Sequence, residues 1–271
     1  MMRPLSTANT TSRHPHASAP WKSAVLGALM GLILALVWFA PARWLAAAVS
    51  TASSGQVQLT QTRGTVWTGS ARLLLSGGAG SRDSAALPGR VAWQLRPGWF
   101  ALNMQINAEC CTSKPFQARL DKRWGRSSIT VFDGASQWPA AVLSGLGTPW
   151  NTVQIDGTLQ LTTNGLLIEW VDGRVAMAGR AELTALGLSS RLSTLKPMGS
   201  YKLTLNGGSA ATLALATLEG SLQLSGSGRW VDSRLRFEGV ASAAPEHEAA
   251  LANLLNIIGR RNGARSIITL G

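Results

Sequence analysis

The longest apolar run in the chain lies near its N-terminus and predicts a membrane helix. Residues 23–42 read SAVLGALMGLILALVWFAPA and contain no charged side chain. A helix needs about twenty such residues to cross a hydrocarbon core of about 30 Å. We therefore expect one transmembrane helix over residues 23–42. Its anchoring side chains are Val25, Leu26, Leu29, Leu32, Ile33, Leu36, Val37, Trp38 and Phe39.

The charges beside this run predict its orientation. Three basic residues and no acidic residue precede it, whereas only Arg43 follows closely. Because positive charges stay on the cytoplasmic side, we expect the N-terminus in the cytoplasm and the rest of the chain outside it. A cleaved signal peptide is the alternative, since small residues recur at 40–42 and 46–48 as in a cleavage site. The length of the run and Pro41 favour a retained anchor.

The segments on either side of the apolar run differ in pattern. Residues 1–22 form a polar string without an apolar period, which predicts a disordered cytoplasmic tail. Residues 43–55 are expected to be a linker. From Gln56 onward, short segments alternate apolar and polar positions, which is the period of half-buried strands. Residues 56–271 are therefore predicted to form one β-rich domain.

Turn-forming residues separate the predicted strands, and only one strong helical pattern follows. Gly, Asn and Asp recur at intervals of about 8–12 residues, as in hairpins and meanders. A helical period appears at residues 245–258, with a weaker one at 139–146. Gly259 is placed as a C-cap, and residues 266–270 read as a closing strand. The apolar stripe of the later helix consists of Leu251, Leu254, Leu255 and Ile258.

The predicted fold class is mainly β. It combines one N-terminal transmembrane helix, a long curved antiparallel β-sheet and one amphipathic C-terminal helix. A sheet with one apolar face has to cover that face with helices, with itself or with another molecule. Because little helix is predicted, we expect the sheet to close partly on itself or to hold an apolar ligand.

Composition adds a basic charge that bears on partners. The chain carries a formal net charge of +12, and from Arg43 onward it has 22 basic and 13 acidic residues. Outside the cytoplasm a protein rarely meets nucleic acid, so anionic lipid headgroups or an acidic protein partner fit this excess better, unless it serves solubility alone. Residues 119–126, RLDKRWGR, combine four basic residues with Trp124. We interpret them as a solvated hairpin tip in preference to an anion clamp.

Tryptophan and cysteine usage are both unusual. The chain has eleven tryptophans against one tyrosine and five phenylalanines. We expect most of the tryptophans to fill the core and a minority to line a partner-binding face. Cys110 and Cys111 are adjacent, and a disulfide between neighbours closes a strained ring. We therefore expect no disulfide between them, and their spacing does not match a zinc site.

The inventory of reactive side chains argues against an enzyme. His247 is the only histidine beyond the predicted anchor, and it falls on the amphipathic helix. The nucleophile elbow, the zinc-protease helix, the phosphate-binding loop and the dinucleotide-binding loop are all absent from the sequence. We predict no catalytic residues, no cofactor and no metal. A hydrolase built around His247 is the enzymatic alternative.

Residues 63–72 read RGTVWTGSAR and are followed by LPGRVAWQLRP at residues 87–97. These ordered motifs resemble the opening of the exported domain in the type II secretion system protein N family, also called general secretion pathway protein N. The similarity continues through residues 157–161, 168–170, 195–201 and 220–270. The resemblance implies structural roles for Gly64, Trp67, Gly69, Trp93 and Tyr201.

This resemblance also implies a function. The resemblance implies a non-enzymatic subunit that crosses the bacterial inner membrane once, with its N-terminus in the cytoplasm and most of the chain in the periplasm. Such a subunit serves as a scaffold in the export of folded proteins and contacts the inner-membrane platform or the secretin. The strand surplus also resembles AsmA-like proteins, which implies an alternative in periplasmic lipid handling or envelope assembly with an apolar groove. The oligomeric state stays open.

Overall fold

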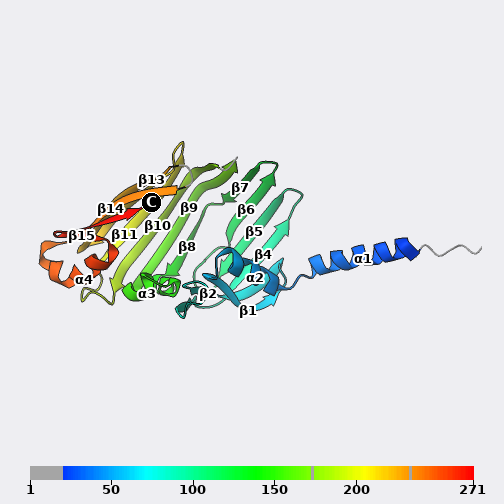
Figure 1. Cartoon of the computed structure of the whole chain (residues 1–271), viewed down its shortest axis with the longest axis horizontal. Coiled ribbons are helices and arrows are strands. Elements are labelled where there is room, and N and C mark those ends of the chain that lie inside the picture. Colours follow the sequence, from blue (N-terminus) through cyan, green and yellow to red (C-terminus); the bar gives the residue numbers. More distant parts are fainter. Residues whose placement is uncertain (1–20, 172–173, 232–233) are drawn as a thin grey trace, which may run out of the picture. The chain divides into compact units, whose positions relative to one another are not determined.

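A computed structural model describes residues 21–171, 174–231 and 234–271 (Figure 1). The chain divides into two compact units, the first ending at Phe39 and the second running from Ala40 to Gly271. The first unit contains α1 (Trp21–Trp38), in which every side chain is exposed. By length and composition α1 is able to cross a membrane, although an N-terminal signal sequence meets the same criteria. The helix ends earlier than residue 42 because proline at position 41 disfavours helix in the residue before it.

The second unit begins with a helix where the sequence predicted a linker. Helix α2 (Ala42–Ala52) follows Pro41 and packs on the sheet. Its Ala42 is 2% exposed and lies in a cluster with Ala71 and Trp93, against which Leu45 also packs. The prediction of a linker at 43–55 is therefore corrected. The apolar period was hidden because alanine makes up much of this helix.

The rest of the second unit is one open antiparallel sheet. Within the described residues it has sixteen strands, in the order β1-β2-β4-β5-β6-β7-β9-β10-β11-β12-β13-β14-β16-β15, with β3 beside β2 and β8 beside β9. The strands are β1 (Val57–Gly64), β2 (Thr68–Ser76), β3 (Ser84–Ala86), β4 (Val91–Pro97), β5 (Ala101–Ala108), β6 (Phe116–Arg123), β7 (Arg126–Val131), β8 (Gly134–Pro139), β9 (Ile155–Val171), β10 (Arg174–Ser190), β11 (Gly199–Gly208), β12 (Thr212–Gly220), β13 (Leu222–Val231), β14 (Arg234–Ala243), β15 (Arg260–Asn262) and β16 (Arg265–Leu270). The predicted fold class, a mainly β chain with a long antiparallel sheet, is confirmed. The partial closure considered above is not observed, since β1 and β15 lie at opposite ends of the described strand order.

The antiparallel register keeps the apolar side chains on one face. Trp93 of β4 pairs with Ile106 of β5, and Leu95 pairs with Met104. In β9 the apolar positions change from odd numbers, such as Leu161, to even numbers, such as Ile168. Between these positions, a shift in the β9–β10 register leaves one extra residue in β9. Because side chains alternate between the two faces, this extra residue brings the odd-numbered and the even-numbered apolar side chains to the same face.

The helices cover this apolar face in three separate clusters. One lies under the start of α2, beside Trp93 and Leu95 of β4, whereas those under the 3₁₀ helix η1 (Ala140–Leu146) and under α4 (Glu248–Ile258) lie at the end of the strands away from the hairpins. The long connections and the short helix α3 (Trp150–Val153) lie at the same end, whereas the described connections at the opposite end are short turns. In Figure 1 the hairpins line the top of the sheet and α2, α3 and α4 lie near the bottom.

Helix α4 forms the largest of these contacts. Its Leu251, Leu254 and Leu255 are at most 2% exposed and belong to a cluster with Tyr201 and Leu222. A 3₁₀ turn, η2 (Pro245–His247), precedes α4, so that together they occupy the predicted helical range. Gly259 is extended rather than a left-handed cap, because the chain continues directly into β15.

The packing of α4 predicts a large loss of stability on truncating Leu254. Leu254→Ala removes a buried side chain, and we expect it to lower the free energy of unfolding by about 2–5 kcal/mol. Chemical denaturation followed by circular dichroism measures this change. Ile257→Ala on the same helix is the matched control, because Ile257 is 41% exposed and its truncation should cost far less. Equal losses in the two variants would contradict the packing described here.

Candidate functional site

The sequence motif GxxWxG at residues 64–69 forms the turn between β1 and β2. Gly64 has a φ of +86°, a left-handed conformation that side chains other than glycine rarely adopt. Gly69 pairs with Gly64 and also with Trp93 on the next strand. A Cβ atom at Gly69 would lie 2.6 Å from Cζ2 of Trp93 and 2.7 Å from the carbonyl oxygen of Arg63. The two glycines therefore permit a tight turn with an indole ring directly beside it.

Trp93 ties this turn to the core. Its side chain is 5% exposed, and its indole N–H donates a hydrogen bond of 3.0 Å to the carbonyl oxygen of Val66. The backbone N–H of Val66 donates to the carbonyl oxygen of Ala40, at 2.8 Å. One peptide segment thus joins the first residue of the second unit to a buried tryptophan. The sequence did not predict this link, because Val66 makes both hydrogen bonds with backbone groups, which do not depend on the type of side chain.

The structure brings together some of the residues that the resemblance singled out and separates others. Gly64, Gly69 and Trp93 lie in contact, and Trp67 is half-buried with its carbonyl oxygen accepting from the N–H of Leu95 at 2.6 Å. Tyr201 lies elsewhere, in the α4 cluster. Its side chain is 4% exposed, and its hydroxyl donates to the carbonyl oxygen of Leu222 at 3.0 Å. Burial raises the pKa of this phenol above its usual value.

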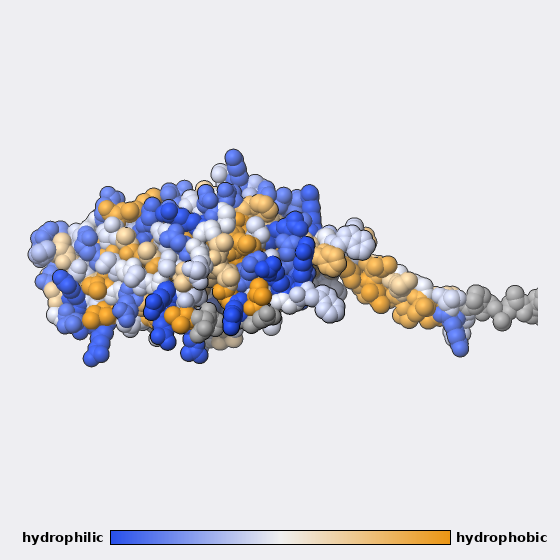
Figure 2. All heavy atoms as spheres, turned by 90° about the horizontal axis from the view of Figure 1, so that it is seen from above, coloured by the Kyte–Doolittle hydropathy of each residue, from blue (hydrophilic) through white to orange (hydrophobic). Residues whose placement is uncertain are grey.

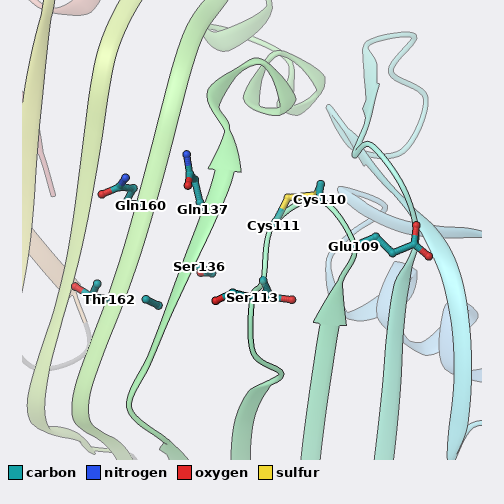
Figure 3. A pocket seen from close by; sticks show the side chains of 10 residues that line it. Glu109, Cys110, Cys111, Ser113, Ser136, Gln137, Gln160 and Thr162 are labelled. Atoms are coloured by element: carbon teal, nitrogen blue, oxygen red, sulfur yellow. A yellow bond between two sulfur atoms is a disulfide. The ribbon is translucent and has the colours of Figure 1, made fainter.

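A pocket of about 510 Å³ opens beside the loop that joins β5 and β6 (Figure 3). In this loop Cys110 and Cys111 form a disulfide, which corrects our expectation that neighbouring cysteines stay unbridged. A turn at residues 109–111 makes this pairing possible, and Cys111 is buried with its carbonyl oxygen accepting from the N–H of Gln137. The pocket is lined by Glu109, Cys110, Cys111, Thr112, Ser113, Ala135, Ser136, Gln137, Gln160 and Thr162.

The chemistry of this pocket is that of neutral hydrogen-bonding groups. Glu109 is its only ionisable side chain, and its carboxylate accepts the backbone N–H of Arg90 at 3.0 Å. Figure 3 shows Glu109 directed away from the disulfide. Within the described residues, no group of three or more His, Cys, Asp and Glu side chains lies together. His247 lies 3.8 Å from Glu246 on η2, at the α4 end of the sheet.

The polar face of the sheet carries ion pairs rather than a reactive cluster. Glu182 lies between Lys202, at 3.3 Å, and Arg180. The hydrogen bond from Lys202, with the charges of both basic residues, lowers the pKa of the Glu182 carboxyl despite some desolvation. The ion pair between Glu182 and Lys202 links β10 to β11, where Lys202 is the strand partner of Thr184. Because the pKa of the Glu182 carboxyl is lowered, Glu182 lacks the raised pKa that a general acid needs.

The described short turns opposite the helices form the surface that we call the hairpin edge. It comprises residues 98–100, 124–125 and 209–211 together with the strand ends on the same side, which are residues 96–97, 122–123, 126, 174, 229–231 and 234–236. Trp99 is 97% exposed, Phe100 is 71% exposed and Trp124 is fully exposed. Figure 2 looks down on the domain from the top of Figure 1 and shows hydrophilic residues mixed with apolar ones on this side. Exposed basic side chains of the edge are Arg96, Lys122, Arg123, Arg126, Arg174, Arg229, Arg234 and Arg236.

The burial of the tryptophans differs from what we expected from the sequence. The structure describes all eleven tryptophans, and Trp93 alone among them is buried. The others are exposed or half-buried, so most do not fill the core. Residues 119–126 form a two-residue hairpin turn, with Arg123 paired to Arg126 around Trp124, in agreement with our interpretation of this segment.

Comparisons with known proteins bear on this domain. A family model described as type II secretion system (T2SS), protein N, matches residues 55–268, which is nearly the whole second unit. The match agrees with the resemblance carried by residues 63–97. No curated protein and no solved structure matches the chain.

The contact between Gly69 and Trp93 predicts that a methyl group is not tolerated there. Gly69→Ala should lower the free energy of unfolding by about 1–3 kcal/mol, because the added carbon overlaps the indole and a carbonyl oxygen. Gly208→Ala is the matched control, since the nearest atom to a Cβ there is 3.9 Å away. Thermal and chemical denaturation compare the two variants. Comparable stability of both would show that the indole does not occupy this position.

The buried phenol predicts a loss of stability in alkaline solution. Above a pH of about 10 the unfolded chain ionises its tyrosine while the folded chain does not, so the free energy of unfolding falls as pH rises. Below that pH the contribution is fully present. Because the chain has a single tyrosine, absorbance at the tyrosinate band reports Tyr201 alone. Titration near pH 10 in a folded protein, or an unchanged pH profile in Tyr201→Phe, would contradict the prediction.

Proposed function

Because the chain belongs to the type II secretion system protein N family, we propose that it is a non-enzymatic subunit of the type II secretion apparatus whose β-sheet domain acts as an assembly element. The observation that carries this proposal is the extent of the family match, which spans residues 55–268 and so includes nearly the whole sheet with α4. The apparatus exports folded proteins, and the chain's role in it is that of a scaffold.

The proposed location is the inner membrane of a bacterial cell. Helix α1 has the length and composition of a span, and the basic residues before it outnumber those just after it. On the positive-inside rule, α1 is the anchor and Ala40–Gly271 stands in the periplasm. A disulfide between Cys110 and Cys111 supports this side of the membrane, because such bonds persist in oxidising compartments.

The scaffold role is supported by what the family motif does in the structure. Gly64, Gly69 and Trp93 pack a turn against the sheet, and the small pocket that Gly69 and Trp93 line has no ionisable side chain among its lining residues. Glu109 of the larger pocket and Glu182 of the polar face are held by hydrogen bonds and ion pairs within the domain. By this proposal the partners are other secretion subunits, in the inner-membrane platform or the secretin. The family match supports secretion over lipid handling as the function.

Deletion of the gene, with its neighbours intact, tests the proposal. We expect secreted enzymes to accumulate folded in the periplasm and export to return when the chain is supplied in trans. Crosslinking of the full-length chain in membranes, followed by mass spectrometry, should recover platform or secretin subunits. Gly208→Ala should complement fully, whereas a variant without residues 23–39 should fail if the anchor matters. Normal export in the deletion strain, together with no crosslinked secretion subunit, would refute the proposal.

A further inference from the structure

We propose that the hairpin edge is a second membrane-contact surface, which places Trp99, Phe100 and Trp124 in the headgroup layer of an anionic bilayer. This goes beyond anchorage by α1, because it assigns a lipid-binding role to the folded domain itself. The proposal rests on the exposure of these side chains, on the charges around them and on the place where the domain begins.

The aromatic side chains protrude from the domain without a partner in it. Trp99 and Phe100 form the turn between β4 and β5, and Trp124 lies at the tip of the turn between β6 and β7. At 97%, 71% and full exposure they shield none of the core. Indole and phenyl rings gather at membrane interfaces, where the ring lies among headgroups and the indole N–H stays near water. Two neighbouring aromatic tips are therefore suited to shallow insertion.

The basic side chains around these tips favour an anionic surface. Eight exposed arginine and lysine side chains belong to the hairpin edge. Among the described acidic residues near them, Asp121 pairs with Arg119 at 3.0 Å and Glu169 pairs with Arg126, itself a residue of the edge, at 3.6 Å. Glu238 lies two residues from Arg236, so basic side chains still outnumber acidic ones along the edge. Asp172 and Asp232 lie outside the described residues. Clustered basic residues beside a bilayer bind anionic lipids, and the attraction extends over about one Debye length.

The start of the domain lies at the same end of the strands. The carbonyl oxygen of Ala40 accepts the N–H of Val66, and Pro41 forms a β-bridge with Thr65. The neighbouring Trp67 is hydrogen-bonded to Leu95, four residues before Trp99. A fully extended chain spans at most about 14 Å over four residues, so Trp99 lies within that distance of Leu95. A chain that leaves a bilayer just before Ala40 thus begins its fold close to the exposed tips.

Helix α2 continues this surface chemistry. Immediately after Ala40 it exposes Arg43 and Trp44, the latter to 50%. A basic residue beside an exposed indole is the same pairing that the hairpin tips present. Protein hot spots are also rich in tryptophan and arginine, but they cluster in one compact patch, whereas these indoles and basic side chains are spread along several turns and onto α2. The observations therefore favour a lipid surface over an acidic protein as the occupant.

Hydrogen exchange of the full-length chain in nanodiscs tests the proposal. Amides of residues 98–100 and 124–125 should exchange more slowly in discs of phosphatidylcholine with phosphatidylglycerol than in discs of phosphatidylcholine alone. Replacing Lys122 and Arg123 by serine removes two charges from the edge, and we expect this protection to weaken by about tenfold or more. High salt should weaken it as well, because these side chains are solvent-exposed.

Matched controls separate contact from unfolding. Lys114→Ser removes an exposed charge at the opposite end of the strands, and Trp150→Ser removes an exposed indole there. Neither should change protection of the tips. Exchange at the tips that is equal in the two kinds of disc would overturn the proposal. Protection that appears only when secretion subunits are added would overturn it in favour of a protein partner, and either result leaves the export test above unaffected.

Discussion

The antiparallel register is the constraint on which the rest of the domain depends. Side chains alternate between the two faces of a strand, so a slip of one residue would exchange the apolar face for the polar one. The register Trp93↔Ile106 and Leu95↔Met104 holds both strands in phase. In the long strands β9 and β10 the apolar positions change parity, and the two register shifts in their pairing restore the phase. Because the phase is kept from β1 to β16, one continuous apolar face results, and the positions of α2, η1 and α4 follow from the need to cover it.

As a consequence, the two ends of the strands differ in how far their apolar face is covered. Helices and long connections gather at one end, where burial of Leu251 and its neighbours supplies the strongest apolar contact. Near the hairpins at the other end, apolar residues such as Leu120 and Ile129 are only half-buried and lie outside the three buried clusters. A sheet that buries its face at one end only is stable there, and its opposite end is available for contact with other molecules.

Much of this fold was predictable because period-two patterns survive in the sequence. Several strands, such as β4, β5, β11 and β14, were visible as alternations, and the α4 stripe and the closing strand β16 were visible as well. Helix α2 was not, since a run of alanines and small residues offers little contrast between faces. The disulfide at Cys110 and the exposure of Trp99 depend on turn geometry, which residue type alone does not determine. The hydrogen bonds of Val66 were beyond sequence reasoning altogether, because any residue presents the same backbone groups.

Val66 shows why a motif of structural residues matters to a function at the membrane. Its carbonyl oxygen accepts from the buried indole of Trp93, and its N–H donates to Ala40. The indole has room in this position only because Gly69 lacks a side chain. The GxxWxG turn therefore also fixes the point at which the chain that follows the proposed anchor joins the sheet. A turn held by Trp93 on one side and by Ala40 on the other leaves the connection little freedom at this point, which suits the proposed scaffold role.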